Sequence, residues 1–397
     1  MKKHLTRLLM TSLLSLSGFY SGPLYAQASS QTIEIAYLKL VQDQGPVLSN
    51  IFPIPEDSGQ RGAELAIQDS NTTGRFLNQK YQLSQVVSQD FSAISEQAAT
   101  LYSRGIRFFV TDIPAKELQL LAQQLGDQAL FFNAGTQDDA LRTTDCVSNL
   151  LHTIPSRAML TDALAQWLQV KRLTRWLMIT GTTPEDTAYA EAMKRAAKRF
   201  GHKIVAEKHW SFDTDLRRSA QKEMPVFTQT DEYDVVVVAD ERGDFGEYVL
   251  YNTWYPRPVV GTQGLTPVAW HRVVEQWGAA QLQSRFDQLA HRWMNNKDYA
   301  AWLAVRSIAE AVTRTKKTEV DAIKHFIASE QFELAGFKGR KLSYRAWSGQ
   351  LRQPIPLVHA RSLVSQSPQE GFLHPVSELD TLGFDKPESQ CNLMKNF

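Results

Sequence analysis

The sequence predicts an α/β protein built from two doubly wound parallel-sheet lobes joined by a hinge. Three observations support this prediction. The chain has 397 residues, segments with strand and helix periodicity alternate along most of it, and the alternation restarts after Cys146. A chain of this length suits two lobes of roughly 100–200 residues each. Strands separated by helices form parallel sheets, because the chain must cross over to return to the same edge.

The N-terminus has the composition of a secretory signal peptide. Lys2, Lys3 and Arg7 precede an apolar run over 8–19, and residues 26–28 read Ala-Gln-Ala, an Ala-x-Ala cleavage motif. The run is too short to span a bilayer comfortably. A membrane anchor is the less favoured alternative, because no cysteine follows the run to carry a lipid. We therefore expect residues 1–28 to be removed and the mature chain to be soluble and periplasmic.

The first half of the mature chain alternates regularly between the two periodicities. Residues 32–38 alternate as a strand, and a long loop over 39–57 follows that could wall a cleft. The remaining expected elements are a helix over 58–69, a strand over 81–87, a helix over 92–103, a strand over 106–110, a helix over 115–125 and a strand over 130–133. This order predicts one doubly wound lobe.

The second half repeats this order. Its expected elements are helices over 159–169, 187–200, 215–228 and 243–251, with strands over 176–180, 203–209, 234–239 and 256–261. Four consecutive valines over 235–238 indicate a strand buried on both faces, and Gly201 is placed to end a helix in the left-handed conformation. Further helices are expected near 282–285 and over 296–313 and 322–329. Antiparallel strands are then expected near 342–345 and 355–360.

Charge and cysteine content restrict the classes of partner. The 43 Lys and Arg residues nearly cancel the 42 Asp and Glu residues, so no long-range field favours nucleic acid or an anionic membrane. In an oxidising compartment Cys146 and Cys391 could form a disulfide; two unpaired buried thiols are the alternative. The histidines are scattered, without metal-ligand spacing, and no nucleotide-binding or nucleophile-elbow motif is present. We therefore expect no cofactor and no metal.

Candidate binding residues follow the predicted strands. In open α/β sheets a ligand binds at the carboxyl ends of the strands, near helix N-termini. Thr111 and Asp112 follow one strand, where capping of the next helix is the favoured interpretation and a role in the cleft is the alternative. The polar segment 133–138 follows another strand, and its backbone N–H groups could hold a carboxylate. The second lobe offers residues 181–186, 239–243 and 261–264.

Two adjacent acidic pairs are the only suggestion of catalysis. Asp138–Asp139 and Asp240–Glu241 could act as acid and base or hold a cation if both carboxylates of a pair faced one cavity. Adjacent acids at loop exits are more often helix-start charges. An enzyme is therefore the unfavoured hypothesis.

Several segments resemble a known family. Residues 33–36, 60–67 (Gln-Arg-Gly-Ala-Glu-Leu-Ala-Ile) and 71–74 (Asn-Thr-Thr-Gly) look like the opening of the type I periplasmic substrate-binding proteins of branched-chain amino acid ABC transporters. The resemblance continues through 133–141 and 180–194 and covers nearly the whole mature chain. Residues 71–77, 336–342 and 351–355 further resemble a subgroup associated with PQQ-dependent alcohol dehydrogenase systems.

The resemblance implies a periplasmic binding protein-like I fold with hinge crossings near Leu150, Pro258 and Phe337. It implies five segments: a signal peptide (1–28), the first part of lobe 1 (29–150), the first part of lobe 2 (151–257), a return segment of lobe 1 (258–336), and strands of lobe 2 with a C-terminal tail (337–397). A small-molecule solute, an inner-membrane ABC permease and a monomeric state are the implied partners and assembly.

The resemblance also suggests binding residues. Ala134, Gly135 and Thr136 correspond to the loop with which the family holds an amino-acid carboxylate, Thr111–Asp112 to the preceding loop, and Gln263 to a later acidic or polar position. From the second-lobe segments we add Glu185 and Asp240. The chain departs from the family at Asp112, which brings a negative charge near the carboxylate position, and it lacks the aromatic residue expected near 185–186. These departures favour an alcohol, an amine or a cation-bearing solute over a branched-chain amino acid.

The leading hypothesis is a solute receptor of an ABC importer, without catalytic residues. A periplasmic sensor or modulator of a quinoprotein alcohol-oxidation system, acting without transport, is the alternative. A hydrolase or transferase using the same cleft is the unfavoured third hypothesis.

Overall fold

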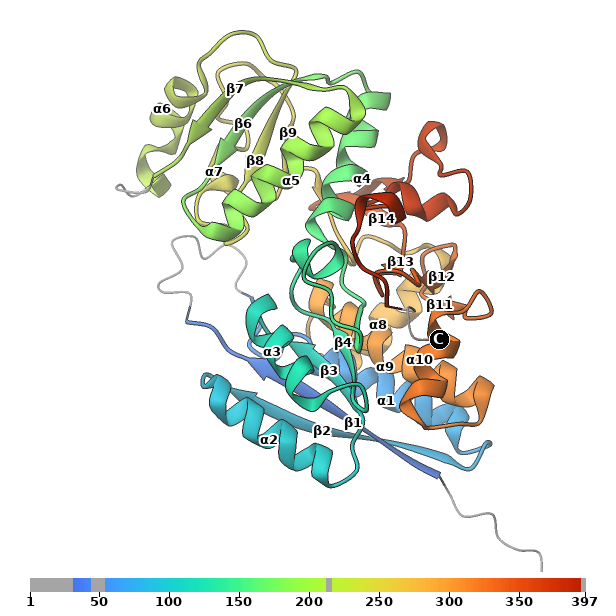
Figure 1. Cartoon of the computed structure of the whole chain (residues 1–397). Helices are drawn as coiled ribbons and strands as arrows, with labels where there is room; N and C mark the ends of the chain where they lie inside the picture. The colour runs from blue at the N-terminus through green and yellow to red at the C-terminus, as the bar shows by residue number, and fades with distance from the viewer. Residues whose placement is uncertain (1–30, 44–53, 212–215, 394–397) are drawn as a thin grey trace, which may run out of the picture.

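The computed structural model describes residues 31–43, 54–211 and 216–393 (Figure 1). The predicted signal peptide, residues 1–28, lies outside the described residues, as does most of the predicted loop over 39–57. Within the described ranges, no helix is both long and apolar enough to cross a membrane.

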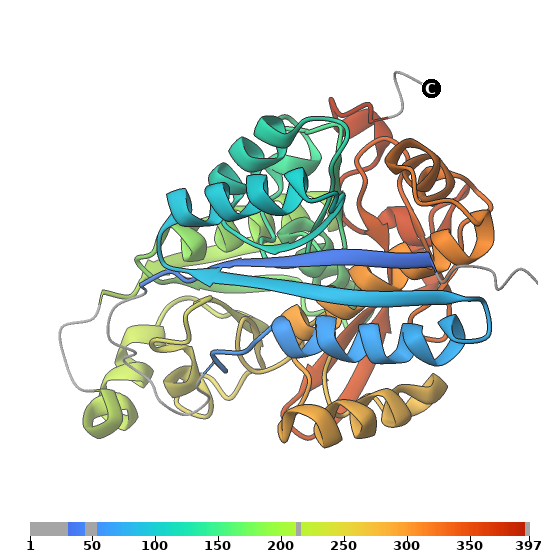
Figure 2. The ribbon, with the colours of Figure 1, turned by 90° about the horizontal axis from the view of Figure 1, so that it is seen from below.

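The first sheet belongs to lobe 1 and is entirely parallel, in the strand order β2-β1-β3-β4-β5. Its strands are β1 (Gln31–Leu40), β2 (Gln79–Ser88), β3 (Phe108–Asp112), β4 (Leu130–Asn133) and β5 (Leu150–His152). The crossover helices are α1 (Gln60–Gly74), α2 (Phe91–Ser103) and α3 (Ala115–Leu125). Figure 2 shows α1 and α2 on opposite sides of the β1–β2 pair.

The second sheet belongs to lobe 2 and has the parallel order β7-β6-β8-β9. Its strands are β6 (Arg175–Thr180), β7 (Lys203–His209), β8 (Val235–Ala239) and β9 (Val259–Gly261). The helices of this lobe are α4 (Arg157–Val170), α5 (Pro184–Phe200), α6 (Leu216–Thr228) and α7 (Gly246–Val249). Gly201 ends α5 in the left-handed conformation, as predicted. The predicted fold class is confirmed, with two parallel sheets that each carry helices.

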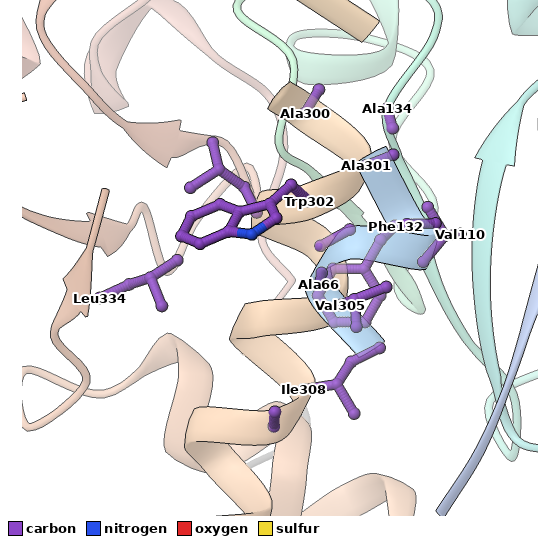
Figure 3. Packing of buried hydrophobic residues seen from close by; sticks show 14 of the residues in the cluster. Ala66, Val110, Phe132, Ala134, Ala300, Ala301, Trp302, Val305, Ile308 and Leu334 are labelled. Carbon is purple, nitrogen blue, oxygen red and sulfur yellow. The ribbon is translucent and has the colours of Figure 1, made fainter. Parts of the chain in front are cut away.

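Each sheet has a hydrophobic core on both faces, because successive side chains of a strand point to opposite sides. In β1, Ile35 and Tyr37 pack in one core, whereas Ala36 and Leu38 pack in the other. Figure 3 shows the first of these cores, where Val110 of β3 and Phe132 of β4 lie on one side of a helix and the Trp302 ring of that helix points to the other side, toward Leu334. The buried valines of β8 divide in the same way between the two cores of lobe 2.

The chain returns to lobe 1 after β9. The helices α8 (Ala279–Ala290), α9 (Asn296–Thr315) and α10 (Val320–Ala328) follow the short strand β10 (Thr266–Pro267), and α8 and α9 pack against α1. The first sheet ends at His152 and the second at Gly261, slightly beyond the crossings expected near Leu150 and Pro258.

The C-terminal region forms two small antiparallel sheets, as the sequence predicts. These are β11-β12-β13 and β10-β14-β15. Their strands are β11 (Leu334–Ala335), β12 (Lys341–Tyr344), β13 (Leu351–Arg352), β14 (Ile355–His359) and β15 (Ser362–Ser367). Ile355 and Leu357 share a core with α4, so this part of the chain covers lobe 2. Short 3-10 helices lie at Ala140–Arg142, Gln276–Gly278, Glu370–Phe372, Glu378–Thr381 and Lys386–Glu388.

Several helices differ in length from the prediction, and for two of them the contacts explain the difference. The first, expected to end at 69, continues to Gly74, because the Asn71 side chain is fixed by two hydrogen bonds to the backbone of Tyr81 on β2. The helix expected over 243–251 is only one turn long, Gly246–Val249. The backbone N–H groups just before it and at its start bind the side chain of Asp240. Both differences come from tertiary or loop contacts that periodicity does not show.

Candidate functional site

The predicted binding residues lie at the carboxyl ends of the two parallel sheets. In lobe 1, Thr111 and Asp112 end β3, and residues 134–136 follow β4. In lobe 2, Asp240 follows β8, Gln263 follows β9, and Glu185 lies in the first turn of the helix after β6. The structure therefore brings five of the eight residues to one sheet edge and three to the other.

Arg157 links the two edges. Its backbone N–H donates to the carbonyl of Gln137, in the loop after β4 of lobe 1, at 3.0 Å. Its guanidinium forms a two-armed ion pair with Glu241, in the loop after β8 of lobe 2, with both N–O distances 2.7 Å. Burial raises the pKa of Glu241, although Arg157 opposes this effect. Arg157 at the start of α4 therefore joins the loop after β4 of lobe 1 to the loop after β8 of lobe 2.

Asp112 is buried and has a cationic partner. Its Oδ1 accepts from Lys297 Nζ, at the start of α9, at 2.7 Å. The sequence interpretation of an uncompensated negative charge here is therefore wrong. Lys297 lies 185 residues from Asp112 in the sequence, so no local pattern could have identified the pair. The other carboxylate oxygen, Oδ2, is buried and has no hydrogen-bond partner.

Neither Thr111 nor Asp112 caps the following helix. The residue at the N-cap position of α3 is Pro114, and no side chain makes a capping hydrogen bond there. The Thr111 hydroxyl instead donates to the carbonyl of Phe132 on the neighbouring strand. The favoured capping interpretation is wrong at both positions.

The loop over 134–136 is closed by a neighbouring side chain. Asn133 Oδ1 accepts from the backbone N–H groups of Gly135 and Thr136, at 3.1 and 3.0 Å. Its amide nitrogen donates back to the Thr136 carbonyl. The Ala134 N–H is bonded to the Thr111 carbonyl. The expectation that these backbone donors hold a carboxylate is therefore not met in this conformation, because all three are already engaged.

In lobe 2 the Asp240 carboxylate has a structural partner for each oxygen. Oδ1 accepts from the N–H of Asp244 at 2.9 Å, and Oδ2 accepts from Phe245 and Gly246 at 2.8 and 2.6 Å. Burial raises the pKa of Asp240, and these N–H groups work against that rise. Asp240 thus organises the turn that leads into α7.

The remaining two predicted residues of lobe 2 differ in setting. Glu185 is exposed in the first turn of α5, next to Asp186, which completes a capping box with Thr183. Gln263 is half-buried and packs over the start of α7, where a side chain at position 246 would collide with it. Both residues lie near the carboxyl edge, and Gln263 takes part in its packing.

The other predicted acids are also engaged. Asp138 Oδ1 accepts from the N–H of Ala140 at 2.8 Å, and Asp139 Oδ1 accepts from the N–H of Ala158 in the first turn of α4 at 3.1 Å. Burial raises the pKa of Asp139. Both carboxylates stabilise local backbone, the role the sequence favoured for adjacent acids.

A buried polar network lies beside this loop. Arg142 donates to Gln350 Oε1 and to the carbonyls of Thr136, Asp138 and Ile154. Gln350 in turn donates to the carbonyls of His152 and Ile154. Burial lowers the pKa of Arg142 to about 10. The network connects the loop after β4 to two segments of the chain, one at His152 and Ile154 and the other at Gln350.

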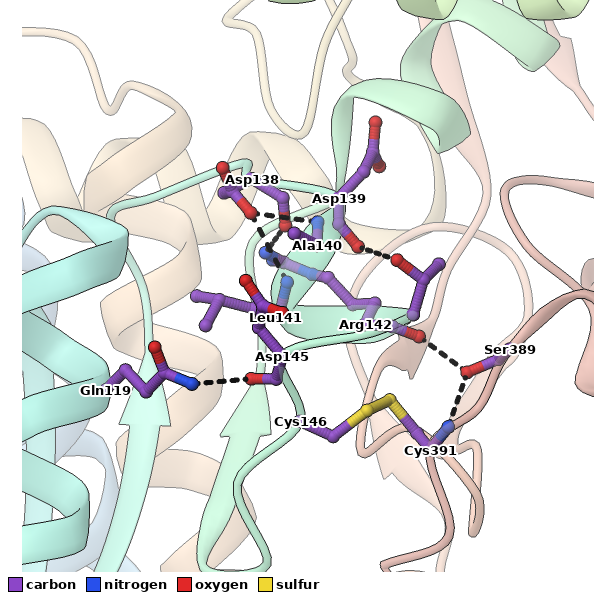
Figure 4. The surroundings of a disulfide bond; sticks show 11 residues. Gln119, Asp138, Asp139, Ala140, Leu141, Arg142, Asp145, Cys146, Ser389 and Cys391 are labelled. Atoms are coloured by element: carbon purple, nitrogen blue, oxygen red, sulfur yellow. Dashed lines mark hydrogen bonds between the residues drawn. A yellow bond between two sulfur atoms is a disulfide. The ribbon is translucent and has the colours of Figure 1, made fainter.

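Cys146 and Cys391 form a disulfide with their Cα atoms 5.6 Å apart. Figure 4 shows that the C-terminal tail is fixed nearby by Ser389, whose hydroxyl donates to the Arg142 carbonyl and accepts from the Cys391 N–H. The bridge thus anchors the tail beside the Arg142 network of lobe 1.

Two surface cavities are present, and the first includes Gly264 of the candidate segment 261–264. One of about 660 Å³ is lined by residues such as Trp167, Tyr251 and Val364 of lobe 2. Another of about 700 Å³ lies beside α8, lined by residues that include Gln283 and Trp293. None of the eight predicted residues lines either cavity. The part of the chain that the structure describes contains no cluster of three potential metal-ligating side chains.

No known protein family matches the sequence, and no curated protein is similar to it in sequence. Solved structures share the fold. A branched-chain amino acid ABC transporter periplasmic ligand-binding protein from Burkholderia xenovorans LB400 is 14% identical, with a TM-score of 0.70 over 91% of this chain and 99% of that chain. An ABC transporter substrate-binding protein from Sphaerobacter thermophilus is 16% identical, with a TM-score of 0.68 over 89% and 100%. A periplasmic binding protein from Burkholderia mallei is 12% identical, with a TM-score of 0.67 over 92% and 100%.

These likenesses establish the fold, which is that of the two-lobed type I periplasmic binding proteins. Two of these three structures are described as binding proteins of ABC transporters, and the third as a periplasmic binding protein. The sequence resemblance and the structural comparison therefore agree on the fold, although sequence identity is low.

Proposed function

We propose that this chain is a periplasmic solute receptor of an ABC importer, which binds a small polar solute between its lobes and catalyses no reaction. The observation that carries this proposal is the link through Arg157 between the carboxyl edges of the two sheets. In parallel α/β sheets these edges are where ligands bind. The fold shared with periplasmic binding proteins supports the proposal.

The hinge of this receptor would lie where buried hydrogen bonds of Lys338 and Gln353 join two of the chain crossings between the lobes. Lys338 is 1% exposed, and its ammonium donates to Gln353 Oε1 at 2.7 Å. Gln353 Nε2 donates to the carbonyl of Thr153 at 2.8 Å, which joins the third expected crossing to the first. Closure around solute would be a hinge motion, in which the solute stabilises the closed state by its higher affinity for that state.

The proposal extends to the whole protein. Residues 1–28 would act as a signal peptide, the mature chain would be periplasmic and monomeric, and an inner-membrane permease would receive the solute. The five segments implied by the resemblance, including lobe 2 strands and tail over 337–397, describe this organisation. Membership of the subgroup associated with PQQ-dependent alcohol dehydrogenase systems is also proposed, on the residues 71–77 and 336–342.

Thermal unfolding of the mature protein tests this function. The panel would contain amino acids, short alcohols, amines, organic acids, quinone cofactors and metal ions. A true solute present at 100 times its Kd should stabilise the folded state by about 2.7 kcal/mol. A well-folded protein that no compound stabilises would contradict the receptor function and favour a role in which the ligand is another protein.

A further inference from the structure

The strand order places Asp112 at a distinctive point of lobe 1. In the sheet, β2 lies on one side of β1, and β3 lies on the other side. The direction in which strands are added therefore reverses after β2, and the switch point lies between β1 and β3. The crevice at such a switch point is where open α/β sheets bind ligands. Lys39 of β1 pairs in register with Asp112 at the end of β3. Asp112 therefore lies at the carboxyl end of β3, at this switch point.

Only one of the two carboxylate oxygens of Asp112 has a hydrogen-bond partner. The residue is 7% exposed, Oδ1 is bound by Lys297, and Oδ2 has no hydrogen-bond partner. A buried carboxylate oxygen without a donor is unfavourable, and native proteins keep few such groups without a functional reason. The side chain of Lys297 is itself 41% exposed. The buried carboxylate therefore contacts a side chain that reaches the solvent.

Neighbouring donors are committed to other acceptors. Lys39 Nζ donates to the carbonyls of Glu56 and Ser58, at 2.6 and 3.1 Å. The N–H groups of Gly135 and Thr136 donate to Asn133 Oδ1. A Cβ at position 135 would lie 2.2 Å from Asp112 Oδ1, so the missing side chain of Gly135 is what allows the carboxylate to lie over this loop.

The corresponding switch point of lobe 2 provides an internal comparison. The order β7-β6-β8-β9 places it between β6 and β8, and Asp240 directly follows β8. Asp240 is also buried, yet three backbone N–H groups satisfy both of its oxygens. Burial of an aspartate at a switch point therefore does not by itself leave an oxygen free in this protein.

We propose that Asp112 Oδ2 accepts a hydrogen bond from the solute, so that the solute presents an ammonium or hydroxyl group, and not a carboxylate, to lobe 1. This subsite presupposes that the chain is a solute receptor, as proposed above. The carboxylate of Asp112 itself occupies the place over the 134–136 loop, and its Oδ2 can accept a hydrogen bond from an ammonium or hydroxyl group but has no proton to donate to a second carboxylate. Lys297 acts as a positioning residue, because it holds Oδ1.

Calorimetric titration of the mature protein with three probes of equal chain length tests the subsite. The probes are 1,3-diaminopropane, propane-1,3-diol and malonate, which offer ammonium, hydroxyl and carboxylate groups. We expect the diamine or the diol to bind at least tenfold more tightly than malonate. Which of the two binds distinguishes a cationic from a neutral donor.

Variants assign the effect to Asp112. Asp112→Asn replaces one oxygen by a donor, and it should weaken the preferred probe at least tenfold. Asp90→Asn is the matched control, because this carboxylate follows β2 at the same edge of lobe 1 but caps α2 by accepting from the N–H of Ser92; the affinity of this variant for the preferred probe should be unchanged. Asp112→Ala provides the same test if the asparagine variant does not fold.

Three results would overturn the subsite. Tighter binding of malonate than of both donor probes contradicts it and leaves the receptor function standing. Equal affinities of the wild type and Asp112→Asn for the preferred probe also contradict the subsite and leave the receptor function standing. If no compound of the wider panel binds to the folded wild type, the receptor function is contradicted and the subsite with it.

Discussion

The two lobes have the same parallel architecture and place an aspartate at the same topological position, yet the two aspartates differ in state. Asp240 in lobe 2 is bound by three backbone N–H groups, whereas Asp112 in lobe 1 keeps one buried oxygen without a partner. The following residues explain the difference. Lobe 2 continues through a turn whose N–H groups at 244–246 fold back onto Asp240. Lobe 1 enters α3 through Pro114, which has no N–H to donate. The aspartate at the switch point therefore stabilises a turn in lobe 2 and keeps one oxygen without a partner in lobe 1.

The lobes also differ in their covalent support. Lobe 1 is bridged to the C-terminal tail by Cys146–Cys391, and the chain contains no further cysteine. Lobe 2 is held by packing, hydrogen bonds and ion pairs, such as the pairs of Asp162 with Arg195 and Arg199. The stability of both lobes should therefore depend on redox conditions, because the bridge starts in lobe 1 and the segment that it closes contains lobe 2.

The largest expected effect tests whether the lobes unfold separately. Trp176 on β6 and Phe109 on β3 are completely buried in different lobes. Replacing either by alanine should cost about 3–5 kcal/mol, because it removes a large apolar side chain and leaves a cavity. In urea unfolding followed by circular dichroism, we expect two transitions, of which Trp176→Ala shifts one and Phe109→Ala the other. A single transition that both variants shift alike would show that the lobes form one cooperative unit.

Removal of the disulfide should have the next largest effect. The double variant Cys146→Ala/Cys391→Ala should lose about 2–5 kcal/mol, because the unfolded chain is no longer constrained over a separation of 245 residues. Both transitions should shift, because the segment closed by the bridge contains the elements of lobe 2 as well as the return helices of lobe 1. As a control, a reducing agent should destabilise the wild type but leave the double variant unchanged. An unchanged stability of the double variant in both transitions would contradict a stabilising role of the bridge.

The two aspartates should differ in their contribution to stability. Asp240→Asn should cost about 1.5–3 kcal/mol, because it replaces one acceptor by a donor facing backbone N–H groups and removes charge-assisted hydrogen bonds. Asp112→Asn should cost less than about 1 kcal/mol, since its remaining oxygen can still accept from Lys297 and no partner of Oδ2 is lost. Thermal unfolding of the two variants without solute measures this contrast. Equal losses would remove the distinction between a structural and an available carboxylate.

The smallest expected effect concerns Glu185. It is exposed in the first turn of α5, where its charge interacts with the helix dipole. Glu185→Gln should cost about 0.3–1 kcal/mol, and the cost should fall as salt screens the charge. Its effect on solute affinity is the sharper measurement. An unchanged Kd in calorimetry would remove Glu185 from the proposed binding residues and leave those at the β8 and β9 ends.

The sequence by itself determined the architecture and the positions of the candidate residues at the ends of the strands. Strand and helix periodicity is a local property, so the alternation of elements, the buried valine strand and the left-handed Gly201 could be predicted from neighbouring residues. The rule that ligands bind at the carboxyl ends of parallel strands then selected Asp112 and Asp240 without any knowledge of their contacts.

Only the tertiary structure decided what those residues do. Lys297 meets Asp112 across 185 residues of sequence, and Arg157 meets Glu241 across 84. These partners come from helices whose positions depend on packing of the whole lobe, and an isolated Lys or Arg in a helix's first turn gives no indication of its partner. The closing of the 134–136 loop by Asn133 depends equally on side-chain geometry. Local periodicity is set by backbone hydrogen bonding and burial of one face, whereas the state of a carboxylate is set by which distant donors the fold brings to it.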